Sequence, residues 1–276
     1  MSTYSASDGA ELAYDLAGQG APLLCIPGGP GRDPIYMEGL GGLAAGRQLI
    51  VLHPRGAGRS SQSSDPSDYG AERLAQDSLD LAEHLGEDQV DLLGHSAGAF
   101  AAVIAATDQR AKVRRVVLVA PTRMLAPQVP DDTEDILAAR SSEPWYDEVQ
   151  NALSGANPES AAEMIALVSK VSPAFYGGWD SARQRHAERL QDQVNLETME
   201  NTPDPPALKL KPGELNLNAL VITGEQDAAS GTAIGDPIAD FFANGRHVVM
   251  PRCGHYPWVD EPKQFVSIID SFLNAD

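Results

Sequence analysis

A pentapeptide with serine at its centre carries the strongest chemical signal in the sequence. It reads Gly94-His95-Ser96-Ala97-Gly98, follows an apolar run and opens an alanine-rich stretch. A strand, a G-x-S-x-G turn and a helix in this order lift the serine hydroxyl clear of a sheet, where it can act as a nucleophile. The small residues can instead serve close packing of the strand against the helix. We expect Ser96 to be the nucleophile.

A serine hydroxyl needs a base that takes its proton and an acid that orients the base. Behind a G-x-S-x-G turn, these groups follow the serine in the order acid, then histidine. Asp227 comes just after the apolar run 217–223, and His255 just after the run 246–250, so both are expected at carboxyl ends of strands. A turn-capping aspartate and a loop histidine are the alternative interpretations. The other candidate acids nearby are Glu225, Asp236 and Asp260.

Backbone amides must bind the oxyanion that such a reaction forms. One expected donor is Ala97, directly after the serine. The other is Gly29 in the turn Pro27-Gly28-Gly29-Pro30-Gly31, because Pro30 has no N–H. The turn can instead simply lead into the next helix. It is not a phosphate-binding loop, since the sequence has neither a G-K-[ST] motif nor a dinucleotide fingerprint.

Substrate-binding residues are harder to predict than the reacting groups. Large or cyclic side chains close to these motifs give a candidate pocket of Pro30, His95, Trp145, Tyr146, Tyr256 and Trp258. Trp145 and Tyr146 can instead form a local core of their own. The histidines lack H-x-x-x-H and H-E-x-x-H spacing, and Cys25 is far from Cys253, so we expect no metal and no other cofactor. Cys253 is interpreted as a small packing residue, with exposure near His255 as the alternative.

Alternating apolar runs and helical stretches must position these groups. Expected strands cover 2–7, 11–16, 22–26, 48–53, 89–93, 115–120, 217–223 and 246–250, the first two forming a hairpin at Asp8-Gly9. Expected helices cover 34–45, 71–85, 97–106, 233–242 and 263–273. This order predicts an α/β fold with a mostly parallel sheet. Only helices are expected from 123 to 211, which predicts a core of 1–122 and 213–276 with a helical insertion at 123–212.

Composition narrows the class of protein. The chain has 276 residues, of which 42% are hydrophobic and 21% charged, as in ordinary globular proteins. A net charge of −19 disfavours nucleic acid and anionic membranes as partners. No apolar run could span a membrane and no secretory signal is visible, so we expect a cytoplasmic protein, bacterial in its alanine and arginine usage. Its partner is expected to be a small-molecule substrate, and its state a monomer or a homodimer.

Acidic residues are concentrated between Asp131 and Pro206. They form either a solvated helical surface or a lid whose field favours cationic and neutral substrates over anionic ones.

Five segments in a fixed order carry a resemblance to a known family. They are PGGPG at 27–31, RGAGRS at 55–60, GHSAG at 94–98, GEQD at 224–227 and GHYPW at 254–258. Together they resemble the α/β-hydrolase superfamily, and PGGPG, RGAGRS and a helical insertion are most similar to its proline iminopeptidase-like branch. The resemblance implies a helical cap over Ser96, with substrate held between cap and core.

The sequence also departs from that branch. Pro27 replaces a usual His, and His53 replaces a usual Asp. His95 and Ala97 flank Ser96 where the branch has Gly and Trp. These changes leave the expected triad intact, but they leave the substrate open.

We therefore expect a cofactor-free serine hydrolase that cleaves an ester or amide of a small-to-medium substrate through an acyl-enzyme. One alternative is a proline iminopeptidase, whose cap carboxylates would bind the free amine of the substrate. A lactonase or carbon–carbon bond hydrolase is another, and a non-hydrolytic relative (acyltransferase, lyase or ligand binder) is a third. Candidate amine-binding carboxylates are Glu143, Asp147, Glu148, Glu197 and Glu200.

Overall fold

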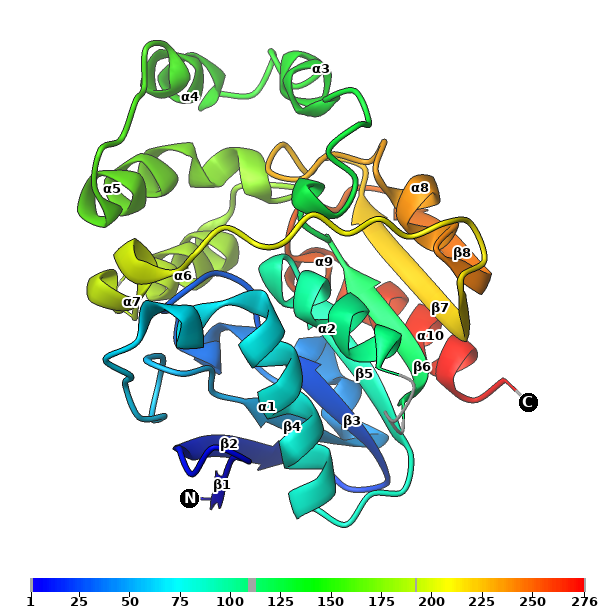
Figure 1. The fold of residues 1–276 in the computed structure, drawn as a ribbon. Helices are drawn as coiled ribbons and strands as arrows, with labels where there is room; N and C mark the ends of the chain where they lie inside the picture. Colours follow the sequence, from blue (N-terminus) through cyan, green and yellow to red (C-terminus); the bar gives the residue numbers. More distant parts are fainter. Residues whose placement is uncertain (1, 109–112, 192, 276) are drawn as a thin grey trace.

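An eight-stranded sheet runs through the protein (Figure 1). The structure is a computed structural model that describes residues 2–108, 113–191 and 193–275. The strand order is β1-β2-β4-β3-β5-β6-β7-β8; β1 and β2 are antiparallel to their neighbours and all other pairs are parallel. The predicted, mostly parallel α/β sheet is therefore confirmed. The strands are β1 (Ser2–Ser5), β2 (Glu11–Ala17), β3 (Ala21–Ile26), β4 (Arg47–Leu52), β5 (Val90–His95), β6 (Val113–Val119), β7 (Leu215–Gly224) and β8 (Phe242–Met250).

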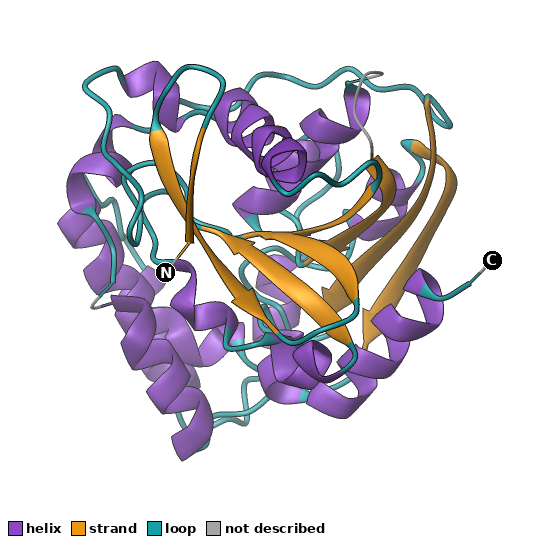
Figure 2. Ribbon diagram, turned by 90° about the horizontal axis from the view of Figure 1, so that it is seen from below, coloured by secondary structure: helices purple, strands orange, loops and turns teal. Residues whose placement is uncertain are grey.

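Two apolar layers enclose the sheet, which explains why its central strands are apolar along their whole length. Successive side chains of a strand point to opposite faces, so Leu92 packs in one layer and Leu93 in the other. Helices α1 (Ala71–His84), α2 (Ala97–Thr107) and α8 (Gly235–Ala239) contribute to the first layer. Helices η2 (Leu40–Ala45), α9 (Pro257–Asp260) and α10 (Pro262–Leu273) contribute to the second. Figure 2 shows helices on both sides of the twisted sheet.

Two predicted helices differ from the observed structure. The range 34–45 holds two 3₁₀ helices, η1 (Pro34–Met37) and η2, because Glu38 and Gly39 between them and Leu40 at the start of η2 all have positive φ. The range 233–242 holds only the short helix α8, and Phe242 already pairs with Leu215 at the start of β8. Both segments are short and apolar, a pattern that does not separate helix from strand or turn.

Residues 123–212, which we call the cap segment, are helical wherever the structure describes regular elements in them, apart from one isolated bridge between Val194 and Arg32. The helices lie at the edge where the parallel strands end, coloured green to yellow in Figure 1. That the segment acts as a cap remains a prediction. Its helices are η4 (Arg123–Leu125), α3 (Thr133–Ala138), α4 (Tyr146–Leu153), α5 (Ala161–Val171), η5 (Ser172–Phe175), α6 (Ser181–Gln191) and α7 (Leu196–Asn201).

Backbone hydrogen bonds attach the cap segment to the loops at the strand ends. The amide of Asn195 donates to the carbonyl of Gly31 at 2.8 Å, and the amide of His255 donates to the carbonyl of Phe175 at 2.7 Å. The loop after β3 and the loop after β8 therefore face a fixed helical layer. Across the described ranges, no helix is both long and apolar enough to cross a membrane.

Candidate active site

Ser96 occupies the sharp turn between β5 and α2. Its backbone has φ 52° and ψ −119°, outside the helical and extended regions, although serine is not a glycine. Such a conformation costs on the order of 1–3 kcal/mol and persists where the surrounding structure holds it. Here the Ser96 amide donates to Val119 at 3.0 Å, and its carbonyl accepts from Thr122 at 3.2 Å. The turn is thus fixed by β6 and by the residues after it.

The two glycines around Ser96 serve close packing, as the alternative interpretation required. A Cβ at Gly94 would lie 2.6 Å from the Gly98 carbonyl oxygen, and one at Gly98 would lie 2.4 Å from the carbonyl oxygens of Ile26 and Pro27. Helix α2 can therefore start directly against β3 and β5. This packing does not explain the strained backbone of Ser96 itself, so the two interpretations apply to different residues of the motif.

Asp227 and His255 meet at the ends of β7 and β8. Oδ2 of Asp227 lies 2.9 Å from Nδ1 of His255, and both side chains are almost fully buried, with 0% and 9% exposed. Oδ1 of Asp227 accepts hydrogen bonds from the amides of Ala229 at 2.8 Å and Ser230 at 3.1 Å. These bonds fix the carboxylate, so it can hold the imidazole in one orientation.

The other candidate acids are engaged elsewhere. Glu225 accepts from the Arg252 amide, and Asp236 accepts from Nδ1 of His247. Asp260 binds the amides of Gly177 and Gly254 and the guanidinium of Arg183, which joins the cap segment to the loop carrying His255. Of the four acids considered from the sequence, Asp227 is the one bonded to His255.

The ring of His95 brings His255 close to the Ser96 turn. The centroids of the two imidazoles are 4.9 Å apart, and Nε2 of His95 donates to the His255 carbonyl at 3.1 Å. Because His95 directly precedes Ser96, the loop of His255 is bound to the residue next to the serine. Ser96, Asp227 and His255 thus come from the ends of β5, β7 and β8 at one edge of the sheet.

The glycine turn after β3 packs against Ser96. A Cβ at Gly28 would lie 2.6 Å from the Cβ of Ser96, and the Gly28 amide already donates to the hydroxyl of Tyr36 at 2.7 Å. Gly29 has φ 76°, and its amide is the next one along the turn. Ala97 is the first residue of α2, where an amide has no partner inside the helix. Gly29 and Ala97 are therefore the two amides best suited to an oxyanion.

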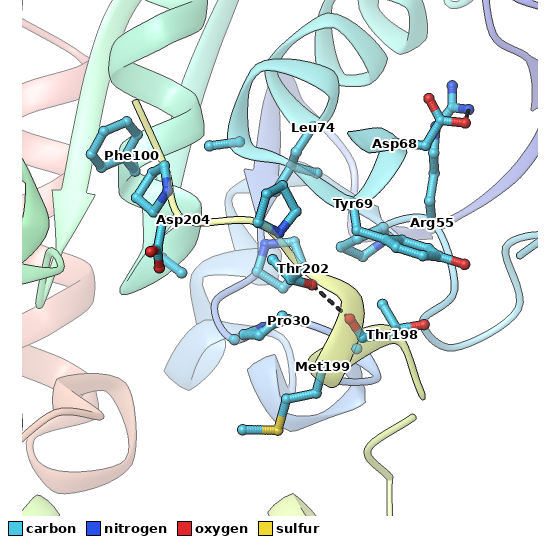
Figure 3. A pocket seen from close by; sticks show the side chains of 18 of the residues that line it. Pro30, Arg55, Asp68, Tyr69, Leu74, Phe100, Thr198, Met199, Thr202 and Asp204 are labelled. Carbon is cyan, nitrogen blue, oxygen red and sulfur yellow. Dashed lines mark hydrogen bonds and ion pairs between the residues drawn. The ribbon is translucent and has the colours of Figure 1, made fainter. Parts of the chain in front are cut away.

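A cavity of about 280 Å³ reaches this turn (Figure 3). In Figure 3, Leu74 and Phe100 from the core lie across from Met199 of the cap segment. Among the ionic groups that line the cavity, Arg55 forms ion pairs with both Asp68 and Asp77, so most of the cavity wall is neutral. The lining comprises Pro27, Gly29, Pro30, Gly31, Pro54, Arg55, Asp68, Tyr69, Ala71, Leu74, Asp77, Ala97, Phe100, Thr122, Met124, Thr198, Met199, Thr202, Pro203, Asp204 and Pro205.

Of the six pocket residues proposed from the sequence, Pro30 lies on the wall of this cavity. His95, Tyr256 and Trp258 are instead at most 2% exposed and stack in one aromatic cluster behind the site. Trp145 and Tyr146 pack in the cap segment's own apolar cluster, as their alternative interpretation stated. Large aromatic side chains gain most from burial, which accounts for the position of these residues in the core beside the site.

The five candidate amine-binding carboxylates are not on the wall of this cavity. Asp147, Glu148, Glu197 and Glu200 are exposed and Glu143 is half-buried. Asp204, which sequence reasoning missed, does line the cavity and has no bonded partner among the described residues. Its position between Pro203 and Pro205 marks an extended segment, but nothing in the sequence indicates which way it faces.

Two further residues beside the site were also missed. Tyr36 binds both Gly28 and His95. The guanidinium of Arg32 lies 5.8 Å from the ring centroid of Tyr36 and donates to the Tyr256 hydroxyl at 3.4 Å, while its buried Nε has no hydrogen-bond partner in the part of the chain that the structure describes. Arg32 directly follows PGGPG, so its cation next to the expected oxyanion donors was the sequence feature that could have identified it.

Cys253 lies in the core of the protein. Cys253 is fully buried, and burial raises the pKa of its thiol to about 12, which suits the packing interpretation. Within residues 2–108, 113–191 and 193–275, no group of three His, Cys, Asp or Glu side chains is placed to hold a metal ion.

Comparisons with known proteins show the family and the fold of the chain. The family model described as "alpha/beta hydrolase fold" matches residues 21–262. A proline iminopeptidase of Lactobacillus delbrueckii subsp. lactis is 25% identical over 92% of this chain and 90% of its own. One from Clostridioides difficile is 23% identical over 99% and 98%.

Solved structures of esterases share the fold. An esterase from Exiguobacterium antarcticum has a TM-score of 0.74 at 17% identity, with 99% of each chain covered. Esterase RhEst1 from a Rhodococcus species has a TM-score of 0.72 at 21% identity, covering 100% of this chain and 99% of its own. The relatives support a hydrolase activity. By its sequence motifs, its mostly parallel sheet and the family model that spans most of its length, the chain belongs to the α/β-hydrolase family, on the side similar to proline iminopeptidases.

Proposed function

We propose that the protein is a serine hydrolase that cleaves an ester or amide of a small-to-medium substrate through an acyl-enzyme. The observation that carries the proposal is the Asp227–His255 pair at 2.9 Å, joined through His95 to a strained Ser96. A buried carboxylate bonded to Nδ1 leaves Nε2 of the imidazole free to act as a base.

In this mechanism, Ser96 attacks the substrate carbonyl while His255 takes the hydroxyl proton. Asp227 holds the imidazole and stabilises its charged form. The amides of Gly29 and Ala97 bind the oxyanion, a contribution of about 3 kcal/mol for one donor in comparable enzymes. His255 then passes its proton to the leaving group, the acyl-enzyme forms, and a water activated by His255 releases the acid.

The cavity beside the oxyanion turn supports an apolar acyl or leaving group. Its wall presents Leu74, Phe100 and Met199, and three of its four ionic groups, Arg55, Asp68 and Asp77, are paired. A cavity of about 280 Å³ suits a substrate of modest size. We therefore place uncharged esters and amides ahead of charged ones as substrates.

A prolyl aminopeptidase is the second candidate. Two observations favour it: the relatives that carry that name, and the unpaired carboxylate of Asp204 on the cavity wall. Asp204 would then bind the free amine of the substrate. In that case Asp204→Asn would lower turnover of a prolyl p-nitroanilide at least tenfold, while hydrolysis of p-nitrophenyl butyrate would stay within twofold.

The test is covalent labelling with a fluorophosphonate, followed by intact mass on wild type, Ser96→Ala and His255→Ala. One adduct on wild type and none on Ser96→Ala is the expected result, with labelling of His255→Ala slowed by orders of magnitude. An unlabelled wild type that is folded, or an adduct that persists on Ser96→Ala, would refute the proposal. Unlabelled wild-type enzyme, with its concentration of active sites known from the labelling, is then compared on p-nitrophenyl butyrate and prolyl p-nitroanilide to separate the two candidates.

A further inference from the structure

Two buried histidines outside the proposed triad are each held between a tyrosine hydroxyl and a backbone carbonyl. His95 lies between the hydroxyl of Tyr36, at 2.8 Å, and the carbonyl of His255, at 3.1 Å. His186 lies between the hydroxyl of Tyr176, at 2.7 Å, and the carbonyl of Tyr36, at 2.9 Å. We call these four residues (Tyr36, His95, Tyr176 and His186) the tyrosine–histidine network.

The direction of each bond around His95 follows from its partners. The amide of Gly28 can only donate, so at 2.7 Å it donates to the oxygen of Tyr36. The single hydroxyl proton of Tyr36 is then left for Nδ1 of His95. The carbonyl of His255 can only accept, so Nε2 of His95 carries the proton that it receives. His95 is thus a neutral imidazole that accepts on one side and donates on the other.

The same reasoning assigns the second pair. The carbonyl of Tyr36 can only accept, so Nε2–H of His186 donates to it. Burial favours the neutral imidazole, whose Nδ1 then accepts from the hydroxyl of Tyr176. Tyr176 directly follows η5, and His186 lies on α6, both in the cap segment. The network therefore runs from the cap segment through η1 to the end of β5 and on to the loop of His255.

Burial keeps the network in this protonation state. The four side chains are at most 2% exposed. Burial lowers the pKa of His186 and lowers that of His95 well below the usual histidine value, with further lowering by the Arg32 cation. A neutral imidazole can accept from a tyrosine hydroxyl at Nδ1 and donate to a carbonyl at Nε2, which matches the observed contacts of both histidines.

The network meets the proposed machinery at two points. Through Tyr36 it binds Gly28, next to the oxyanion donor Gly29, and through His95 it binds the peptide of His255. The backbone N–H of His255 itself donates to the carbonyl of Phe175 in the cap segment. Both backbone polar groups of His255 are thus held, one by the residue before the nucleophile and one by the cap segment.

We propose that Tyr36 and His95 are positioning residues of the hydrolytic reaction: they fix the His255 loop and the glycine turn relative to Ser96, and Tyr176 with His186 anchors this arrangement to the cap segment. The proposal rests on the serine-hydrolase function. A misplacement of about 1 Å in such a site can lower the rate by about 100-fold, so hydrogen bonds behind the reacting groups have a measurable effect.

Tyr36→Phe tests the proposal, because it keeps the ring and removes the oxygen that binds both Gly28 and His95. We expect kcat for p-nitrophenyl butyrate, expressed per fluorophosphonate-labelled site, to fall about 10- to 100-fold, with KM within threefold. Tyr4→Phe is the matched control: Tyr4 is also buried, and its hydroxyl donates to the Asp77 carbonyl at 2.8 Å. It should lose a similar amount of thermal stability and keep wild-type kcat.

Two variants extend the test. In His95→Gln the side-chain oxygen can accept from Tyr36 and the NH₂ can donate toward His255, whereas His95→Leu can do neither; we expect Gln to retain at least ten times the kcat of Leu. Tyr176→Phe should lower kcat by a smaller factor than Tyr36→Phe, about threefold or more. Equal kcat for Gln and Leu would overturn the role of His95, and unchanged kcat in Tyr176→Phe would overturn that of the cap segment.

The two proposals fail in different ways. A folded wild type that is not labelled refutes the serine hydrolase. If wild type is labelled and Tyr36→Phe keeps the full kcat per titrated active site, with only a lower melting temperature, the positioning role of Tyr36 is refuted. The serine-hydrolase proposal is then unaffected.

Discussion

The carboxylate of Asp227 lies 2.9 Å from Nδ1 of His255, although 28 residues separate them in the chain. β7 and β8 are parallel neighbours, so the loops that follow them emerge side by side at one edge of the sheet. The second oxygen of Asp227 is occupied by the amides of Ala229 and Ser230, which prevents the carboxylate from turning away. The pair is therefore preorganised before any substrate arrives.

Replacing Asp227 by Asn should abolish most of the hydrolytic activity while the protein stays folded. An amide can donate to Nδ1 and hold the imidazole in the wrong tautomer, so we expect kcat to fall on the order of 10³- to 10⁴-fold. Asp260→Asn is the contrasting variant, because Asp260 binds Arg183 and two amides instead of His255. It should lower the melting temperature more than Asp227→Asn and kcat far less. The reverse ranking in kcat would make Asp260 the acid.

Gly28 has no room for a side chain beside the nucleophile. In Gly28→Ala the new Cβ would lie 2.6 Å from the Cβ of Ser96 and 2.7 Å from the carbonyl oxygen of His95, so the turn and the elbow must move apart. We expect about 1–3 kcal/mol of lost stability and about a 100-fold lower kcat. Gly46→Ala is a suitable control, since nothing lies within 4 Å of its Cβ and its φ is negative. Equal kcat in the two variants would contradict the prediction.

Stability should fall as the solution becomes mildly acidic. Burial lowers the pKa of His53, His95 and His186 in the folded protein, so the unfolded chain takes up these protons first. Their contribution is complete above the ordinary histidine pKa of about 6.5 and is lost as the pH falls below it, by at most about 1.4 kcal/mol per pH unit for each histidine. Calorimetry at pH 7.5, 6.5 and 5.5 should show a falling melting temperature. A constant or rising value would contradict neutral burial of these rings.

Met199 should control how long a substrate the cavity accepts. It lines the cavity from α7, while Leu74 and Phe100 line it from the core, so the larger side chain of Met199→Trp would occupy part of the cavity (Figure 3). We expect kcat/KM for p-nitrophenyl octanoate to fall about tenfold or more and that for the acetate to change less than twofold. Met164→Trp, at an exposed site on α5, should change neither. A uniform loss on both esters would mean that the cavity is not the substrate site.

The sequence predicted the positions of residues in the fold most accurately where a local motif directly follows an apolar strand. Ser96, Asp227 and His255 each follow a strand whose burial is visible in its composition, and parallel strands bring such loops together. The Gly29 assignment rested on Pro30 lacking an N–H, and the bond between Gly28 and Tyr36 adds a second reason for it. These inferences needed only covalent chemistry and the geometry of a parallel sheet.

Long-range partners were out of reach. His95 was expected to face the substrate, yet its ring turns into the core because Tyr36, 59 residues away, and His255, 160 residues away, satisfy both of its nitrogens. The two 3₁₀ helices in 34–45 replace the predicted single helix for a local reason: the glycines at 39, 41 and 42 all have positive φ, which a continuous α-helix does not accommodate. Cap carboxylates were guessed by charge alone, and charge does not indicate which face of a helix a residue occupies.

The bond from His186 to the carbonyl of Tyr36 limits how this enzyme can be recombined with its relatives. A chimera that exchanged residues 123–212 as a block would keep the carbonyl and discard its donor, leaving a buried acceptor unsatisfied beside the glycine turn. Chimeras that keep Tyr176 and His186 of this protein and exchange only α3, α4 and α5 preserve this hydrogen bond. The cap segment is thus two modules for protein engineering, one exchangeable and one inherited with the core.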